Sequence, residues 1–377
     1  MKRDVAIYAP FGNAFYEDLS EGDEAGPKAG GRELQMMQLA IGLAAQGLRV
    51  AHIVYPMKRP RDLGPSGPDL VERGGYEGDQ RLGPLIEARE IWRGMKEADA
   101  AAYIFRGGGP QMAVAAAFCA LHRRKLVFSS AIDLDFDFER PDRSRAHLIP
   151  YRAAIRRSDL IVVQSQKQLD LARAEDLEPV VMIPSFAEPA EPSRLDPEAF
   201  LWVGRLVRYK GPLEYVRLAE ARPEARFRMV CAYLPESDDD VALWAELQEA
   251  DRRLDNFELI EQLPRERVLE LMDRSVALVS TSSSEGVPNV FLEAWSRGIP
   301  VLSLNYDPDG QITERGLGVA TAGDLDALSD AAGLLWSDRP ERDRMGERGR
   351  EFVRERHDPA VVARRWAEVL SDLLPAR

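Results

Sequence analysis

The chain has 377 residues and a mass of 42.2 kDa, a length that typically forms two domains. Hydrophobic residues make up 45% and charged residues 30%, which excludes disorder, collagen and coiled coil as the main architecture. We find no apolar run long enough to span a bilayer and no apolar signal-peptide core, so we expect a cytoplasmic protein. Cys119 and Cys231 lie in apolar surroundings, which predicts two buried, reduced thiols and no zinc site.

The net charge of −13 is unevenly placed. Residues 1–185 carry 25 basic and 26 acidic side chains, against 25 and 37 in the remainder. The acidic second half argues against nucleic acid as a partner. Basic clusters at residues 122–125 and 152–157 are either solvated helix ends or a patch for an anionic acceptor or anionic lipid, so peripheral contact with the inner membrane face stays open. The sequence gives no indication of an oligomeric state.

Short, continuously apolar runs alternate with helical patterns in the first half, as in parallel sheets buried on both faces. The predicted strands are 4–10, 48–55, 100–105, 125–130, 159–164 and 179–183. The predicted helices include 33–46, 111–124 and 166–174. This βαβ series predicts an α/β domain.

A proline-rich segment at about 184–198 interrupts the series and is the best linker in the chain. A second series follows, with strands at 199–204, 227–232, 257–262, 276–281 and 300–304. We therefore predict two Rossmann-like, doubly wound domains, with ligands at the carboxyl ends of the strands. The domains are 1–185 and 198–358, and a C-terminal helix at about 359–377 is expected to pack back on the first.

Two long loops stand out in the first half, at residues 11–31 and 56–84. Structureless loops of this length are usually functional or disordered. The first is as consistent with a mobile lid as with a plain loop.

The strongest constellation runs from Ser280 to Ala294, where a strand leads through a polar turn into a helix. The turn formed by Gly286, Val287, Pro288 and Asn289 and the first N–H groups of the helix are expected to form an anion site. Glu285 and Glu293 are eight positions apart, and carboxylates are good acceptors for the hydroxyls of a ligand. The alternative is a capped helix with two solvated glutamates.

A second constellation opens the second domain. A strand ends at Gly204, where the backbone can approach a ligand closely. Arg205 and Lys210 follow on the next loop, and two cations at a strand end suit a diphosphate. The alternative is ion pairing with local acids such as Glu214.

Two weaker signals lie in the first domain. Gly30 and Gly31 precede a helix and expose backbone N–H groups, although a flexible loop explains them equally well. The turn at residues 106–110 is either an anion site for an acceptor or a plain tight turn. We find no Gly-x-Gly-x-x-Gly fingerprint after a strand, which disfavours an NAD enzyme.

These motifs together resemble retaining glycosyltransferases of family 4, also called glycosyl transferases group 1, which have the GT-B fold of two facing Rossmann-like domains with an interdomain cleft. The resemblance covers nearly the whole chain. Glu285 and Glu293 match the family's glutamate pair, and residues 204–211 match its Gly-Arg-Leu…Lys-Gly element. Residues 30–33 match its Gly-Gly-x-Glu, and residues 293–301 are similar to the run that follows the second glutamate.

The resemblance implies a role for each motif. Arg205 and Lys210 hold the diphosphate of a nucleotide sugar, expected to be UDP- or GDP-linked, and stabilise its developing charge. Glu293 binds the ribose, and Glu285 lies beside the transferred sugar. Gly30 and Gly31 complete the phosphate cradle. The second domain then binds the donor and the first the acceptor. In this family the leaving phosphate is proposed to take the acceptor's proton, so no protein nucleophile is required.

The sequence departs from the family pattern at two places, which the family uses to contact the sugar and the base of the donor. The histidine that many relatives place after the fourth strand is missing from residues 128–137, and Asp133 or Ser130 is expected to face the sugar instead. The usual Gly-x-Gly after the second strand of the second domain is replaced by residues 231–233. Asp133, Asp135 and Asp137 resemble an Asp-x-Asp metal signature, but we favour a polar strand end on the acceptor side and predict no metal site and no required cofactor.

The leading prediction is a retaining hexosyltransferase that acts in polysaccharide biosynthesis or on a glycan, lipid-linked or small-molecule acceptor. Two alternatives stay open. One is a nucleotide-sugar 2-epimerase of similar architecture, which turns over its substrate without an acceptor. The other is a catalytically silent subunit that binds sugar nucleotides.

Overall fold

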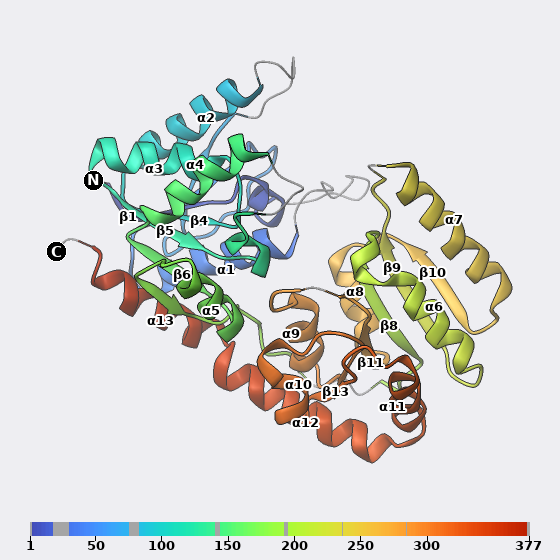
Figure 1. The fold of residues 1–377 in the computed structure, drawn as a ribbon. Helices are drawn as coiled ribbons and strands as arrows, with labels where there is room; N and C mark the ends of the chain where they lie inside the picture. The colour runs from blue at the N-terminus through green and yellow to red at the C-terminus, as the bar shows by residue number, and fades with distance from the viewer. Residues whose placement is uncertain are drawn as a thin grey trace. The chain divides into compact units, whose positions relative to one another are not determined.

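The computed structural model describes residues 2–17, 30–74, 83–139, 144–191, 195–235, 237–283 and 285–374. The chain forms two compact units (Figure 1). Unit 1 comprises residues 1–186 and 359–377, and unit 2 comprises residues 187–358.

Unit 1 is built around a parallel sheet with the order β3-β2-β1-β4-β5-β6-β7 among the described residues. Its strands are β1 (Arg3–Tyr8), β2 (Val50–Val54), β3 (Asp69–Glu72), β4 (Ala100–Arg106), β5 (Lys125–Ser129), β6 (Leu160–Val163) and β7 (Val180–Met182). Its helices are α1 (Gly31–Ala45), α2 (Gly83–Ala98), α3 (Gln111–His122), α4 (Arg145–Arg156), α5 (Gln166–Ala174) and α13 (Pro359–Ser371).

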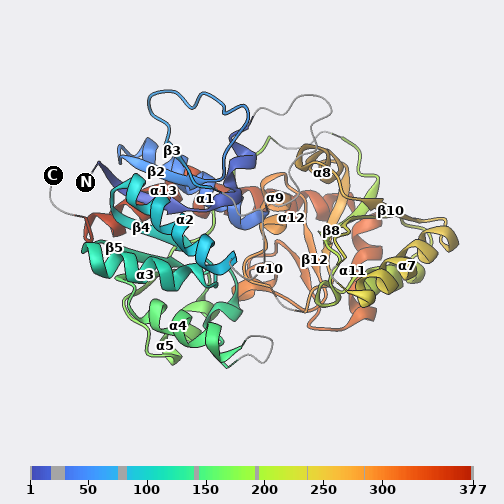
Figure 2. The ribbon, with the colours of Figure 1, turned by 90° about the horizontal axis from the view of Figure 1, so that it is seen from above.

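Both faces of this sheet are buried, because successive side chains of β1 enter different cores. Ala6 and Tyr8 join the cluster beneath α2, α3 and α4, whereas Val5 and Ile7 join the cluster beneath α1 and α13. Figure 2 shows α2, α3 and α4 side by side. Helix α13 approaches α1 closely, since a Cβ built on Gly42 would lie 2.8 Å from that of Ala363. This two-sided burial explains the continuous apolar runs.

Unit 2 repeats the plan with the strand order β10-β9-β8-β11-β12-β13 among the described residues. Its strands are β8 (Ala199–Arg205), β9 (Phe227–Ala232), β10 (Phe257–Glu261), β11 (Ser275–Ser280), β12 (Val301–Ser303) and β13 (Gly318–Ala320). Its helices are α6 (Pro212–Ala221), α7 (Asp238–Arg253), α8 (Arg265–Met272), α9 (Asn289–Ser296), α10 (Gln311–Glu314), α11 (Leu325–Ser337) and α12 (Arg339–Arg356). The predicted pair of doubly wound α/β domains is confirmed.

Two details differ from the sequence prediction. The loop predicted at 56–84 contains β3, a short edge strand. Its end residues Asp69 and Glu72 are charged, so the segment does not form the continuous apolar run by which the other strands were predicted. Strand β13 has only three residues and also escaped prediction. The long loop at 11–31, for which a mobile lid and a plain loop stayed open, falls largely on residues 18–29, which lie outside the described part. Cys119 and Cys231 are buried free thiols, as predicted.

Lowering the pH is expected to destabilise unit 1 through His52. This imidazole is fully buried, with Nδ1 2.7 Å from the hydroxyl of Tyr16, and burial lowers its pKa from 6.5 to about 3. Between these values the unfolded chain binds more protons than the folded one, so stability falls as the pH falls. We expect His52 to contribute a loss of roughly 1.4 kcal/mol per pH unit below its unfolded pKa.

Urea unfolding at pH 7, 6 and 5 tests this expectation. His52→Gln should flatten the pH dependence of the free energy of unfolding, whatever its own stability at pH 7. His122→Gln, which removes an exposed histidine on α3, is the matched control and should keep the wild-type slope. An unchanged slope in His52→Gln would contradict the assignment.

Candidate functional site

The candidate site of unit 2 lies at the point where the strand order reverses, between β8 and β11. In doubly wound sheets this switch point is the usual ligand position, because the loops after the two central strands diverge there. The loop after β8 carries Lys210, and the loop after β11 carries Glu285. The fold therefore brings together the two constellations that the sequence singled out.

Lys210 and Glu285 form an ion pair across this switch point. Lys210 ends a 3-10 turn (Arg208–Lys210), and its side chain is 20% exposed, against 14% for Glu285. The sequence left open that Arg205 and Lys210 pair with nearby acids such as Glu214. In the structure, Lys210 pairs with Glu285, the first glutamate of the family motif. Burial of both side chains makes the pair sensitive to the loss of either member.

The position of Lys210 is fixed by contacts between the two loops. Gly211 has φ +63°, and a Cβ built there would lie 2.4 Å from the carbonyl oxygen of Thr281, so no side chain fits. The hydroxyl of Thr281 accepts from the Trp202 indole at 3.0 Å and lies within hydrogen-bond distance of the Lys210 and Gly211 carbonyls. The backbone N–H of Ser283 donates to the carbonyl of Tyr209 at 2.8 Å.

Arg205 is the last residue of β8 and is exposed, with no ion-pair partner among the described residues. The structure gives the neighbouring Gly204 a packing role, since a Cβ there would lie 2.8 Å from the ring of Trp202. Gly204 is therefore needed for packing against Trp202, whereas the side chain of Arg205 is accessible to a ligand.

Glu293 lies on α9, which begins after Gly286, Val287 and Pro288. Its Oε1 accepts from Nη2 and Nε of Arg265 at 2.7 and 3.1 Å. Arg265 was not predicted from the sequence, where its only signal is its place at the start of α8. A carboxylate has lone pairs for further donors, so Glu293 can bind a ligand hydroxyl while Arg265 orients it.

In unit 1, the Gly-Gly-x-Glu motif forms the start of α1. The backbone N–H of Gly30 donates to Oε2 of Glu33 at 3.0 Å, and Oε1 pairs with Arg32 at 2.7 Å. Glu33 is only 4% exposed. The amide of Gly30, which was expected to cradle phosphate, is thus engaged by Glu33, and the motif as a whole orients Arg32.

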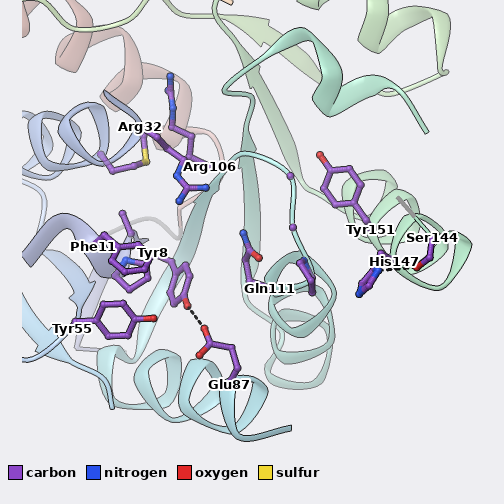
Figure 3. A pocket seen from close by; sticks show the side chains of 16 residues that line it. Tyr8, Phe11, Arg32, Tyr55, Glu87, Arg106, Gln111, Ser144, His147 and Tyr151 are labelled. Atoms are coloured by element: carbon purple, nitrogen blue, oxygen red, sulfur yellow. Dashed lines mark hydrogen bonds between the residues drawn. The ribbon is translucent and has the colours of Figure 1, made fainter. Parts of the chain in front are cut away.

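A cavity of about 640 Å³ lies beside Arg32 in unit 1 (Figure 3). Its lining comes from the loops after β1, β2 and β4 and from helices α1, α2, α3 and α4. Tyr8 and His147 line it, and sequence reasoning missed both. Arg106 also lines it, which favours a binding role over a plain tight turn for residues 106–110. Burial lowers the pKa of Arg106 to about 10, an effect that the charge of Asp135 opposes and that of Arg32 reinforces.

The three alternating aspartates are not arranged as a ligand set. Asp135 accepts from the backbone N–H groups of Ala131, Gly108 and Ile132 at 2.7, 2.8 and 3.2 Å, and burial raises its pKa. Asp133 pairs with Lys167 at 2.8 Å and is outside the cavity lining, although it was expected to face the sugar. Within the described ranges, no three metal-binding side chains cluster. Asp135 holds the turn that presents Arg106.

Some members of both basic clusters of unit 1 have acidic partners. Arg124 pairs with Asp99 at 2.8 Å, and Arg152 pairs with Glu175 at 2.6 Å. Lys125 pairs with Asp159. These contacts favour helix ends over a lipid-binding patch. None of the helices in the described ranges is both long and apolar enough to cross a membrane.

Comparisons with known proteins bear on unit 2 and on the fold. Residues 186–352 match the family model described as glycosyl transferases group 1. No curated protein sequence matches the chain.

Solved structures resemble the chain over nearly its whole length. Sucrose-phosphate synthase from Thermosynechococcus elongatus has 17% identity and a TM-score of 0.75, covering 98% of this chain and 99% of its own. Anabaena HepE in complex with UDP-glucose has 16% identity and a TM-score of 0.75, with 98% and 100% covered. WaaG, a glycosyltransferase involved in lipopolysaccharide biosynthesis, has 17% identity and a TM-score of 0.67, with 97% and 99% covered. The chain thus has the GT-B fold, and its residues 186–352 match the glycosyl transferases group 1 model.

Proposed function

We propose that this protein is a retaining glycosyltransferase of family 4 that moves a hexosyl group from a nucleoside-diphosphate sugar to a carbohydrate or lipid-linked acceptor. The observation that carries the proposal is the pairing of Lys210 and Glu285 at the switch point of unit 2. A cation beside a carboxylate suits a donor whose diphosphate is anionic and whose sugar carries hydroxyls. The match of residues 186–352 to the glycosyl transferases group 1 model supports it.

In the proposed reaction, Lys210 and Arg205 bind the diphosphate of the donor. The bond between the anomeric carbon and the diphosphate oxygen breaks, and the charge that develops on the leaving group is stabilised by these cations. The acceptor oxygen forms the new bond on the same face of the sugar, and its proton passes to the leaving phosphate. Glu285 would then shift from Lys210 to the hydroxyls of the transferred sugar.

The donor is proposed to be UDP- or GDP-linked, with its ribose hydroxyls bound by Glu293 beside Arg265. HepE, whose structure contains UDP-glucose, supports a uridine nucleotide as the first to test. Calorimetric titration with UDP, GDP and ADP identifies the base. Release of nucleoside diphosphate from the matching sugar nucleotide, with and without acceptor, then tests the reaction.

The same experiment separates the proposal from its alternatives. A glycosyltransferase releases nucleoside diphosphate faster with acceptor and retains the anomeric configuration in the product. A 2-epimerase turns over the sugar nucleotide without acceptor, and a silent subunit binds the nucleotide without turning it over. Inversion at the anomeric carbon would contradict the retaining mechanism alone.

Transfer is expected to proceed without a divalent metal. Two cations and the positive end of α9 already supply donors for a diphosphate. The aspartates that resemble a metal signature are engaged elsewhere, Asp135 by backbone N–H groups and Asp133 by Lys167. The initial rate in excess EDTA should stay within about twofold of the rate with added Mg²⁺ or Mn²⁺.

Asp133→Asn is the companion variant for this test. If EDTA abolishes activity, added metal restores it and Asp133→Asn removes it, the aspartates form the site and the metal-free mechanism is wrong. Equal rates with and without metal, together with an active Asp133→Asn variant, agree with the proposal.

A further inference from the structure

The cavity of unit 1 lies at the second switch point of the molecule. The order of this sheet reverses between β1 and β4, and the cavity is lined by residues that follow both strands. Its volume of about 640 Å³ is typical of a small-molecule site. The donor-binding residues proposed above all belong to unit 2, apart from the glycine pair at the start of α1. The proposed donor contacts therefore leave this cavity unused.

Arg106 brings unused hydrogen-bond donors to this cavity. It is the last residue of β4 and is half-buried. Its Nη1 reaches Oγ of Ser129 only at 3.4 Å, and its buried Nε has no hydrogen-bond partner among the described residues. An unpaired donor on a half-buried guanidinium is costly unless a ligand accepts from it.

Nearby acids do not neutralise this group directly. Glu87 is bound by the buried Arg73 at 2.7 Å, and Glu33 is bound by Arg32. Asp135 accepts from three backbone N–H groups of the turn. The start of α3, a 12-residue helix whose first residue Gln111 lines the cavity, adds the positive end of a helix dipole.

Opposite the arginines, the wall is aromatic. Tyr8 stacks on Phe105 with ring centroids 4.7 Å apart, and Phe11 meets Tyr55 edge to face at 5.0 Å. Figure 3 shows Tyr8, Phe11 and Tyr55 grouped on one side, with Arg32 and Arg106 next to one another above them. Aromatic faces suit the C–H surface of a sugar ring, and tyrosine hydroxyls suit its polar edge.

We propose that this cavity binds an anionic carbohydrate, a sugar bearing a phosphate or a carboxylate, with the oxyanion on Arg106 and Arg32 and the ring against Tyr8 and Tyr55. The inference rests on the proposed function in that the bound carbohydrate is the acceptor of the transferred sugar. The acceptor is then selected by its charge, and a neutral sugar of the same shape is a poor one.

Calorimetric titration of the full chain with glucose, glucose 6-phosphate, glucuronate and inorganic phosphate tests the proposal. At least one of the two anionic sugars should bind about 10- to 100-fold more tightly than glucose, and the better of the two identifies phosphate or carboxylate as the preferred group. Inorganic phosphate should compete weakly, because it lacks the ring. Equal binding of glucose and both anionic sugars, or binding of none of them, would overturn the proposal.

Arg106→Gln should remove most of the advantage of the anionic sugar. Arg32→Gln removes a side chain that is 43% exposed but pairs with the buried Glu33, so its thermal unfolding is compared with that of the wild type before sugar binding is measured. Arg89→Gln removes an exposed arginine of α2 outside the cavity lining and should bind like the wild type. If both cavity variants keep the full preference for the anionic sugar, the assignment of the arginines is wrong.

Nucleotide titrations separate this proposal from the proposed function. If UDP and GDP bind and anionic sugars do not, only the acceptor inference fails. If anionic sugars bind and no nucleoside diphosphate does, the cavity assignment stands and the glycosyltransferase proposal fails. If Arg106→Gln weakens nucleotide binding and leaves sugar binding unchanged, the cavity belongs to the donor and the inference is wrong.

Discussion

Lys210→Ala is expected to lower kcat/KM by about 100-fold or more, because one donor to the developing charge of the leaving group contributes ~3 kcal/mol to the transition state. The structure strengthens this expectation in one respect. Gly211 and Thr281 fix the loop that carries Lys210, so the position of this side chain is set by the fold. The measurement is steady-state release of nucleoside diphosphate from the donor.

Loss of Lys210 also leaves Glu285 without its ion-pair partner, and this effect on folding must be kept apart from the effect on catalysis. Thermal unfolding of Lys210→Ala and of the double variant Lys210→Ala/Glu285→Gln measures it. Lys96→Ala removes an exposed lysine of α2 and should leave the rate unchanged. Wild-type turnover in a folded Lys210→Ala protein would contradict the phosphate-binding role.

Glu293→Gln is expected to weaken binding of the bare nucleoside diphosphate by roughly 1.5–3 kcal/mol, since a charge-assisted hydrogen bond to a hydroxyl is lost. Its side chain is 17% exposed and already oriented by Arg265, so little rearrangement is needed to bind a ligand. Glu285→Gln should instead lower turnover, because this carboxylate is placed beside the transferred sugar. Titration with nucleoside diphosphate and steady-state rates give the two readouts.

Glu266→Gln is the matched control, as it neutralises an exposed glutamate on α8 next to Arg265. It should bind nucleotide like the wild type. If Glu285→Gln loses affinity for the bare nucleotide while Glu293→Gln retains it, the two glutamates have been assigned the wrong way round.

The sequence predicted the two sheets well because their strands are buried on both faces. Continuous runs such as residues 100–105 and 275–280 leave little choice of structure. Strand β3 was missed because both of its ends are charged, and β13 was missed because Gly318 and Ala320 flank a single β-branched residue. The motifs at Lys210 and Glu285 were also readable, because each follows a strand and precedes a helix.

Contacts between residues far apart in the sequence could not be predicted in the same way. The contact of Glu293 with Arg265 and that of Asp133 with Lys167 depend on how helices pack, which a single sequence does not encode locally. The cavity at Arg106 joins segments of unit 1 that are far apart in the sequence, from Tyr8 to Tyr151. The turn at 106–110 was recognised from the sequence. The aromatic side chains of Tyr8 and Tyr55, which line the same cavity, were not, because an aromatic residue at the end of an apolar strand looks like a residue of the hydrophobic core.

The most direct test of the account is a titration of the chain with UDP, GDP and ADP, followed by assay of the corresponding sugar nucleotide with an anionic sugar as acceptor. The account predicts that one nucleoside diphosphate binds, that Glu293→Gln weakens this binding, and that the acceptor accelerates release of the nucleotide with formation of a glycoside. Failure of all three nucleotides to bind at millimolar concentration, in a folded protein, would contradict the assignment of a donor site to unit 2.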